Sequence, residues 1–99
     1  MIKLSELTDI LLPVLEESPI KKVIVFGSYA RGDATGDSDI DIIIDSEGKL
    51  NGMNFFVCAD KLAKVLPLKS DIYESAEIKK PSLLYTRILN EGVVIYERA

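Results

Sequence analysis

The spacing of apolar residues in the first fifteen positions predicts an amphipathic helix. These residues recur three and four positions apart, which places their side chains on one face of a helix. Ser5, near the start of the repeat, can serve as the N-cap. Pro13 lies inside the repeat, so we expect it to kink or shorten the helix. The apolar face consists of Leu4, Leu7, Leu11, Val14 and Leu15.

Two strands separated by a short helical turn are predicted next. Residues 21–26, KKVIVF, form an apolar run after two lysines, which is typical of a strand buried on both faces. The two lysines are expected to flank that strand in solvent. Residues 28–32, SYARG, resemble a short helix, and residues 39–45, DIDIIID, predict the second strand. This second strand is unusual because carboxylates interleave with isoleucines at its start.

A second amphipathic helix follows the turn-forming stretch SEGKLNG at residues 46–52. Pro67 is expected to end this helix, because proline cannot continue the hydrogen-bond ladder. The helix is identified by one apolar face, which consists of Phe55, Cys58, Ala59, Leu62, Val65 and Leu66.

The last third of the chain predicts a strand, a helix and a final strand. Residues 68–74, LKSDIYE, alternate as a strand does. Pro81 and Ser82 introduce a helix that runs to about Glu91, and Gly92 stops it before the strand VVIYE. The element order is therefore α-β-α-β-α-β-α-β. It predicts an α/β (α+β) fold in which helices cover a small mixed β-sheet.

Composition places the chain in a broad class. It is 99 residues long, 47% hydrophobic and 28% charged, the balance of a soluble globular protein, and we expect one domain spanning residues 1–99. No segment is long and apolar enough to span a bilayer, and the N-terminus lacks a signal-peptide h-region, so a cytoplasmic location without membrane partners is expected.

The residue types that are missing narrow the chemistry. There is no histidine, which excludes His-dependent triads and most zinc sites. Cys58 is the only cysteine, so no intrachain disulfide can form, and a buried inert thiol is expected. The net charge of −4 argues against direct nucleic-acid binding. Any nucleotide handled here should be small and escorted by a metal ion.

The turn between the first two strands is a candidate anion site. Gly27 and Ser28 follow a buried strand and precede the short helix, a junction whose free backbone N–H groups favour phosphate. Arg31, one helical turn later, can reach the same phosphate oxygens. The alternative is an ordinary strand-to-helix turn with a capping serine. The turn does not match a P-loop, because Asp33 follows Gly32 where that motif has lysine.

The acidic strand is a candidate metal site. Asp39 and Asp41 are two positions apart, so they share one face of a strand with Cα atoms roughly 6–7 Å apart. Carboxylate oxygens select Mg²⁺ or Mn²⁺. The alternative is a solvated edge strand, but the neighbouring anion site favours a magnesium triphosphate. Asp71 is the best third ligand. Asp33 and Asp37 are expected to belong to the loop, where they cap or neutralise neighbours. Asp45, Glu74 and Glu77 fall near strand ends, where solvated acids are common.

The segment GSYARGDATGDSDIDIII resembles the signature of the DNA-polymerase-β-type nucleotidyltransferase superfamily, G-S-x-A-R-G followed by S-D-x-D. The chain's length resembles the minimal nucleotidyltransferase (MNT) branch of that superfamily. The resemblance extends to SDIYE at residues 70–74 and to the ending ILNEGVVIYER. It implies the nucleotidyltransferase fold. It also implies a partner, because minimal members commonly pair with a HEPN-domain toxin, often as its antitoxin.

The resemblance further implies roles for individual residues. Gly27, Ser28, Arg31 and Ser38 belong to the nucleotide-binding motif, with the first two at the β- and γ-phosphates. Asp39, Asp41 and Asp71 would hold two Mg²⁺ ions, and Asp71 would help to deprotonate the attacking hydroxyl. The implied reaction transfers a nucleoside monophosphate, AMP from ATP by family precedent, to a hydroxyl such as a toxin tyrosine, and releases pyrophosphate.

Two other functions remain open at the level of sequence. The chain can be a binding module that masks its partner without catalysis, or a sensor that binds magnesium triphosphate and transfers nothing. The residues do not identify the acceptor, the base of the nucleotide or the oligomeric state, so a homo-oligomer stays open.

Overall fold

The computed structural model describes residues 2–98 and follows the predicted order of elements. One element, a single 3₁₀ turn after the third strand, is additional to the prediction. The elements are α1 (Leu4–Glu16), β1 (Lys22–Phe26), α2 (Ser28–Arg31), β2 (Ile40–Asp45), α3 (Gly52–Val65), β3 (Ser70–Glu74), η1 (Ser75–Glu77), α4 (Leu83–Glu91) and β4 (Val93–Glu97).

The four strands form one mixed sheet in the order β3-β2-β1-β4. β1 is antiparallel to both of its neighbours, whereas β2 and β3 are parallel. A parallel pair needs a crossover connection, and α3 provides it. The expectation of a small mixed sheet covered by helices is confirmed.

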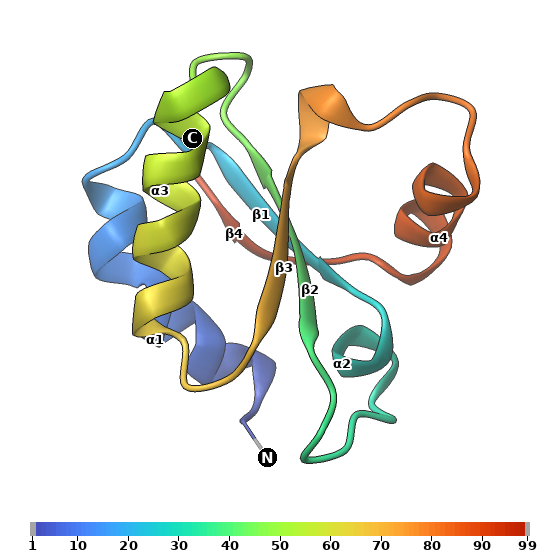
Figure 1. Cartoon of the computed structure of the whole chain (residues 1–99). Helices are drawn as coiled ribbons and strands as arrows, with labels where there is room; N and C mark the ends of the chain where they lie inside the picture. The colour runs from blue at the N-terminus through green and yellow to red at the C-terminus, as the bar shows by residue number, and fades with distance from the viewer. Residues whose placement is uncertain (1, 99) are drawn as a thin grey trace.

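One face of the sheet carries the main hydrophobic core. Figure 1 shows α1 and α3 side by side on this face, with α2 and α4 on the other. Alternate strand residues point toward α1 and α3, as a period of two requires. Burying each of these branched side chains contributes about 1.5–3 kcal/mol. The buried set consists of Val23, Val25, Ile40, Ile42 and Ile44, so the isoleucines between the aspartates of the acidic strand face the core.

The first helix differs from the prediction at both ends. It begins two residues earlier than a Ser5 cap would allow: Lys3 is the N-cap, and its N–H donates to Glu6 Oε1 at 3.2 Å. It also continues past Pro13 to Glu16, so the predicted shortening is wrong. Burial of Leu7, Leu11 and Leu15 explains why the helix tolerates the proline, since packing of that face outweighs one lost hydrogen bond.

The second amphipathic helix packs as predicted, with one exception. Cys58 and Leu62 are buried against the core, and the helix ends just before Pro67. Val65, predicted on the buried face, is 41% exposed. Cys58 is the expected buried thiol, and burial raises its pKa.

The last helix starts and stops at the predicted residues. The Ser82 hydroxyl accepts a hydrogen bond from the Tyr85 N–H at 3.0 Å, which caps the helix. At the other end the Gly92 N–H donates to the carbonyl of Ile88 at 2.8 Å. No residue of α4 is fully buried, so this helix covers its face of the sheet less tightly than α1 covers the other.

Within residues 2–98, no helix combines the length and the apolar character needed to cross a bilayer.

Candidate active site

The turn after β1 is built around Gly27. Its φ of +78° lies in the left-handed region, where glycine is strongly favoured. Its carbonyl accepts the Arg31 N–H at 3.0 Å and so closes the single turn of α2. A Cβ atom added to Gly27 would overlap the Asp41 carboxylate. The absence of a side chain at this position therefore lets the turn lie directly against the acidic strand.

The sheet register brings two of the three predicted carboxylates together. Asp41 on β2 is the direct partner of Asp71 on the parallel strand β3, and neighbouring strands lie about 4.8 Å apart. Asp39 immediately precedes β2, which begins at Ile40, one residue later than predicted. Asp41 is half-buried, whereas Asp39 and Asp71 are exposed. These acids share the end of the sheet that lies beside α2.

The electrostatics of this end are those of a carboxylate cluster. The pKa of Asp41 is raised above 3.8, first by burial and then by the charges of Asp71 and Asp39. The positive charges of Arg87 and Arg31 act in the opposite direction. The repulsion between neighbouring carboxylates is the kind that a bound cation relieves.

The donor set suits a hard divalent cation, although its members do not converge in this structure. All three candidate ligands are carboxylates, the oxygen donors that Mg²⁺ and Mn²⁺ prefer. Within the described part of the chain, no three acidic or cysteine side chains are close enough together to hold a metal ion. The structure thus places Asp39, Asp41 and Asp71 at the same end of the sheet, but not close enough together to form a metal site.

Arg31 is not a free cation. Its Nε donates to Asp33 Oδ2 at 3.1 Å, and its Nη1 donates to Glu91 Oε2 at 2.9 Å. The same Glu91 oxygen accepts the Gly27 N–H at 3.1 Å. Two donors that were expected to bind phosphate are therefore paired with a carboxylate from α4. Asp33 neutralises its neighbour, as predicted.

The two serines of the motif act on the backbone around them. The Ser28 carbonyl accepts the N–H groups of Gly32 and Asp33 at 3.0 and 3.1 Å, which closes the end of α2. The Ser38 hydroxyl accepts the Thr35 N–H at 2.8 Å. This bond closes the loop that delivers the next residue, Asp39, to the site.

Several residues near this site belong to no motif that the sequence analysis identified. Arg87 on α4 has its guanidinium carbon 5.8 Å from the centroid of the Phe26 ring, and its charge also bears on Asp41. The Phe26 and Tyr73 ring centroids are 6.1 Å apart. The pKa of Tyr73 is raised by burial and then by the charges of Asp71 and Asp41. The only sequence signal was the i, i+4 spacing of Arg87 and Glu91, which places both on one helix face.

Glu74 corrects one prediction. It was expected to be a solvated acid at a strand end, but it is only 3% exposed. The Ser46 hydroxyl donates to Glu74 Oε2 at 2.9 Å and accepts the Leu50 N–H at 2.9 Å. Three residues beyond Asp71, Glu74 points to the opposite face of β3. It therefore supports the connection into α3 and does not join the carboxylate cluster.

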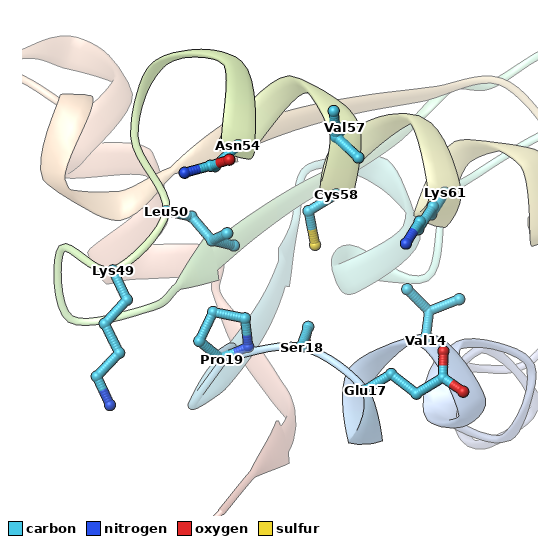
Figure 2. Close-up of a pocket in the computed structure, with 10 residues that line it drawn as sticks. All are labelled: Val14, Glu17, Ser18, Pro19, Lys49, Leu50, Asn54, Val57, Cys58 and Lys61. Carbon is cyan, nitrogen blue, oxygen red and sulfur yellow. The ribbon is translucent and has the colours of Figure 1, made fainter.

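A separate pocket lies on the other face of the sheet. Figure 2 shows it between α3 and the segment that leads out of α1, with the Cys58 sulfur pointing into it. Its volume is about 350 Å³, and none of the predicted site residues lines it. Because the core separates this pocket from the acidic cluster, the two are distinct features.

The four-stranded mixed sheet, the glycine turn and the acidic strand end define a nucleotidyltransferase domain. The chain belongs to the family described as Polymerase beta, Nucleotidyltransferase, which matches residues 10–99. The protein adenylyltransferase MntA of Thermococcus cleftensis is 32% identical over 99 residues, covering 96% of this chain and 98% of MntA. The resemblance read from the sequence is therefore confirmed, and the chain is a nucleotidyltransferase similar to protein adenylyltransferases.

Solved structures share the fold. A toxin–antitoxin complex with AMP-PNP contains a chain that matches with a TM-score of 0.74 at 22% identity, covering 91% of this chain and 73% of that one. A complex of tri-AMPylated Shewanella oneidensis HEPN toxin with its MNT antitoxin matches with a TM-score of 0.70 at 18% identity, covering 96% and 73%. At these identities the likeness establishes the architecture.

Proposed function

We propose that this protein transfers AMP from ATP, with Mg²⁺, to a tyrosine hydroxyl of a HEPN-type toxin and thereby acts as its antitoxin. The observation that carries the proposal is the contact between the Gly27 turn and Asp41, with Asp71 adjacent across the sheet. Relatives support the acceptor, since MntA is named a protein adenylyltransferase and an MNT antitoxin was solved with its AMPylated HEPN toxin.

The residues of the turn would bind and orient the triphosphate. The Gly27 N–H and Ser28 would contact the β- and γ-phosphates, with Arg31 supporting them. Ser38 would act through the loop that it closes, by fixing the position of Asp39. Orientation of this kind and neutralisation of charge supply most of the catalysis in phosphoryl-group chemistry.

The carboxylates would hold the metal ions and manage the proton. Asp39, Asp41 and Asp71 would bind two Mg²⁺ ions, which neutralise the triphosphate charge and lower the pKa of the attacking hydroxyl. Asp71 would accept the hydroxyl proton. The tyrosine oxygen would form a bond to the α-phosphorus while the bond from that phosphorus to the bridging oxygen breaks, and pyrophosphate would leave. No histidine is needed for these steps.

The test uses as the acceptor the protein encoded beside this chain, which the proposal expects to be a HEPN-type toxin. Incubated with ATP, Mg²⁺ and the wild-type protein, the acceptor should gain the mass of one or more adenylyl groups. The Asp39→Asn/Asp41→Asn variant should add none. Asp45→Asn is a matched control because Asp45 lies at the far end of β2, about 13 Å from Asp41 at 3.3 Å per residue. Equal modification by the double variant would refute the proposal.

A non-catalytic masking role is the second candidate function. The observation in its favour is a set of exposed apolar side chains on α3, a composition common in binding surfaces. Met53, Phe56 and Val57 are all at least half exposed. If the Asp39→Asn/Asp41→Asn variant still neutralises the toxin in cells, masking is sufficient and transfer is dispensable.

A further inference from the structure

One carboxylate oxygen already occupies the turn that is proposed to bind phosphate. Glu91 Oε2, at the last residue of α4, lies 3.1 Å from the Gly27 nitrogen and 2.9 Å from Arg31 Nη1. It also lies 3.9 Å from Arg87 Nη2. A backbone amide and two guanidinium groups thus surround a single anionic oxygen, an arrangement equally suited to an oxygen of phosphate.

We propose that Glu91 is an internal competitor of the nucleotide, and that the triphosphate must displace its carboxylate to reach Gly27 and Arg31. The inference rests on the proposed function, because it takes this turn as the triphosphate site. Glu91 is then a residue that sets the affinity for nucleotide, without itself contacting the reacting atoms.

The charges around Arg31 support competition between Glu91 and an incoming phosphate. Arg31 is paired with Asp33 and Glu91 at once, so its positive charge is already compensated before any ligand arrives. The two acids differ in exposure: the side chain of Asp33 is 61% exposed, whereas that of Glu91 is 21% exposed. Water screens the Asp33 charge more effectively, so Glu91 is the stronger opponent of an incoming phosphate.

The hydrogen bond from the Gly27 N–H to Glu91 explains why the carboxylate occupies the turn when no phosphate is bound. Gly27 is buried, and a buried N–H without a partner destabilises the fold. Glu91 satisfies that N–H and holds α4 against the turn. A phosphate oxygen can take the same N–H only after the carboxylate leaves. The contact should therefore stabilise the ligand-free protein and weaken nucleotide binding together.

The test compares Glu91→Gln with wild type, by calorimetric titration with Mg-ATP and with inorganic tripolyphosphate. The variant removes a negative charge beside the phosphates, and we expect on the order of tenfold tighter binding of both probes. Tripolyphosphate should respond as ATP does because the competition concerns phosphate alone. The ligand-free variant should also melt at a lower temperature, and saturating Mg-ATP should raise its Tm more than that of wild type.

Two further variants distinguish competition between Glu91 and phosphate from a role of Glu91 in positioning Arg31. Asp33→Asn also removes a carboxylate partner of Arg31 but leaves Gly27 paired, so it should tighten binding less than Glu91→Gln. Glu91→Asp keeps the charge but shortens the side chain by one methylene group, and it should fall between wild type and Glu91→Gln. Glu97→Gln, which changes an exposed acid paired with Lys22, should bind as wild type does.

The outcomes distinguish this inference from the proposed function. If wild type binds Mg-ATP and Glu91→Gln binds it equally or more weakly, Glu91 only positions Arg31 and does not compete with phosphate, and the inference is wrong. If neither protein binds Mg-ATP or tripolyphosphate, the turn is not a triphosphate site and the proposed function fails with it.

Discussion

At the scale of single residues, the site depends on how closely the turn approaches the acidic strand. Gly27 combines a left-handed φ with a position against the Asp41 carboxylate, and both features exclude a side chain. Asp41 in turn is half-buried beside two other acids. Burial and the neighbouring acids therefore make ionisation of Asp41 less favourable than that of a solvated carboxyl, an effect that a bound cation would offset.

Gly27→Ala should impair both stability and transfer. The positive φ alone costs about 1–3 kcal/mol in a residue with a Cβ atom, and displacement of Asp41 adds to it. Urea denaturation and the adenylylation assay measure the two effects. Gly36→Ala is the matched control, because a Cβ atom there meets no neighbour within 4 Å and should change neither property. Wild-type behaviour of Gly27→Ala would contradict the close contact.

Asp41→Asn should raise the Tm of the metal-free protein near neutral pH. The folded-state pKa of Asp41 is raised, so its contribution to stability is present below the unfolded value of 3.8 and is lost as pH rises through the folded pKa. The advantage of the variant should therefore vanish below pH 3.8. Melting curves across this range test it. Mg²⁺ should raise the Tm of wild type and not that of the variant. A lower Tm for the metal-free variant near neutral pH would contradict the repulsion of Asp41 by Asp71 and Asp39.

At the scale of elements, α4 is the least predictable contributor. Its boundaries follow from Ser82 and Gly92, which act locally and can be read from sequence. The contacts of Arg87 and Glu91 with the Gly27 turn and its surroundings cannot be read in this way, because only the packing of α4 against β1 brings these residues there. The acids of β3 are equally hard to assign from sequence. Asp71 lies beside Asp41, whereas Glu74, three residues further on, points to the opposite face and is buried.

Ser82→Ala should destabilise the protein by about 1 kcal/mol, since it removes the N-cap of α4. Ser5→Ala is the informative comparison, because Ser5 was the N-cap predicted from sequence but lies inside α1, where its loss should change stability by less than about 0.5 kcal/mol. Chemical denaturation measures both. A larger effect at Ser5 than at Ser82 would reverse the assignment of the two caps.

At the scale of the whole molecule, one face of the sheet packs the hydrophobic core and the other holds the proposed site. The face under α1 and α3 holds the continuous core, and the face under α2 and α4 holds the acidic cluster (Figure 1). The order of elements could be predicted because hydrophobic periodicity and turn residues are local signals. The strand order, the Asp41–Asp71 pairing and the Glu91 contact depend on residues far apart in the chain, so no local pattern encodes them.

Hydrogen exchange should reveal this division. Amides of α4, which has no fully buried residue, should exchange faster than those of α1, whose Leu7, Leu11 and Leu15 are buried. Mg-ATP should slow exchange around Gly27 and leave α1 unchanged. Equal protection of the two helices would show that the faces are not energetically distinct.

The central claim, adenylyl transfer to a protein hydroxyl, is tested most directly by the position of the label in ATP. The proposed partner, a HEPN-type toxin, is incubated with this protein, Mg²⁺ and ATP labelled at either the α- or the γ-phosphorus. Attack at the α-phosphorus predicts that only the α label becomes attached to the partner, while the γ label leaves as pyrophosphate. Attachment of the γ label, or no attachment of either label, would contradict the claim.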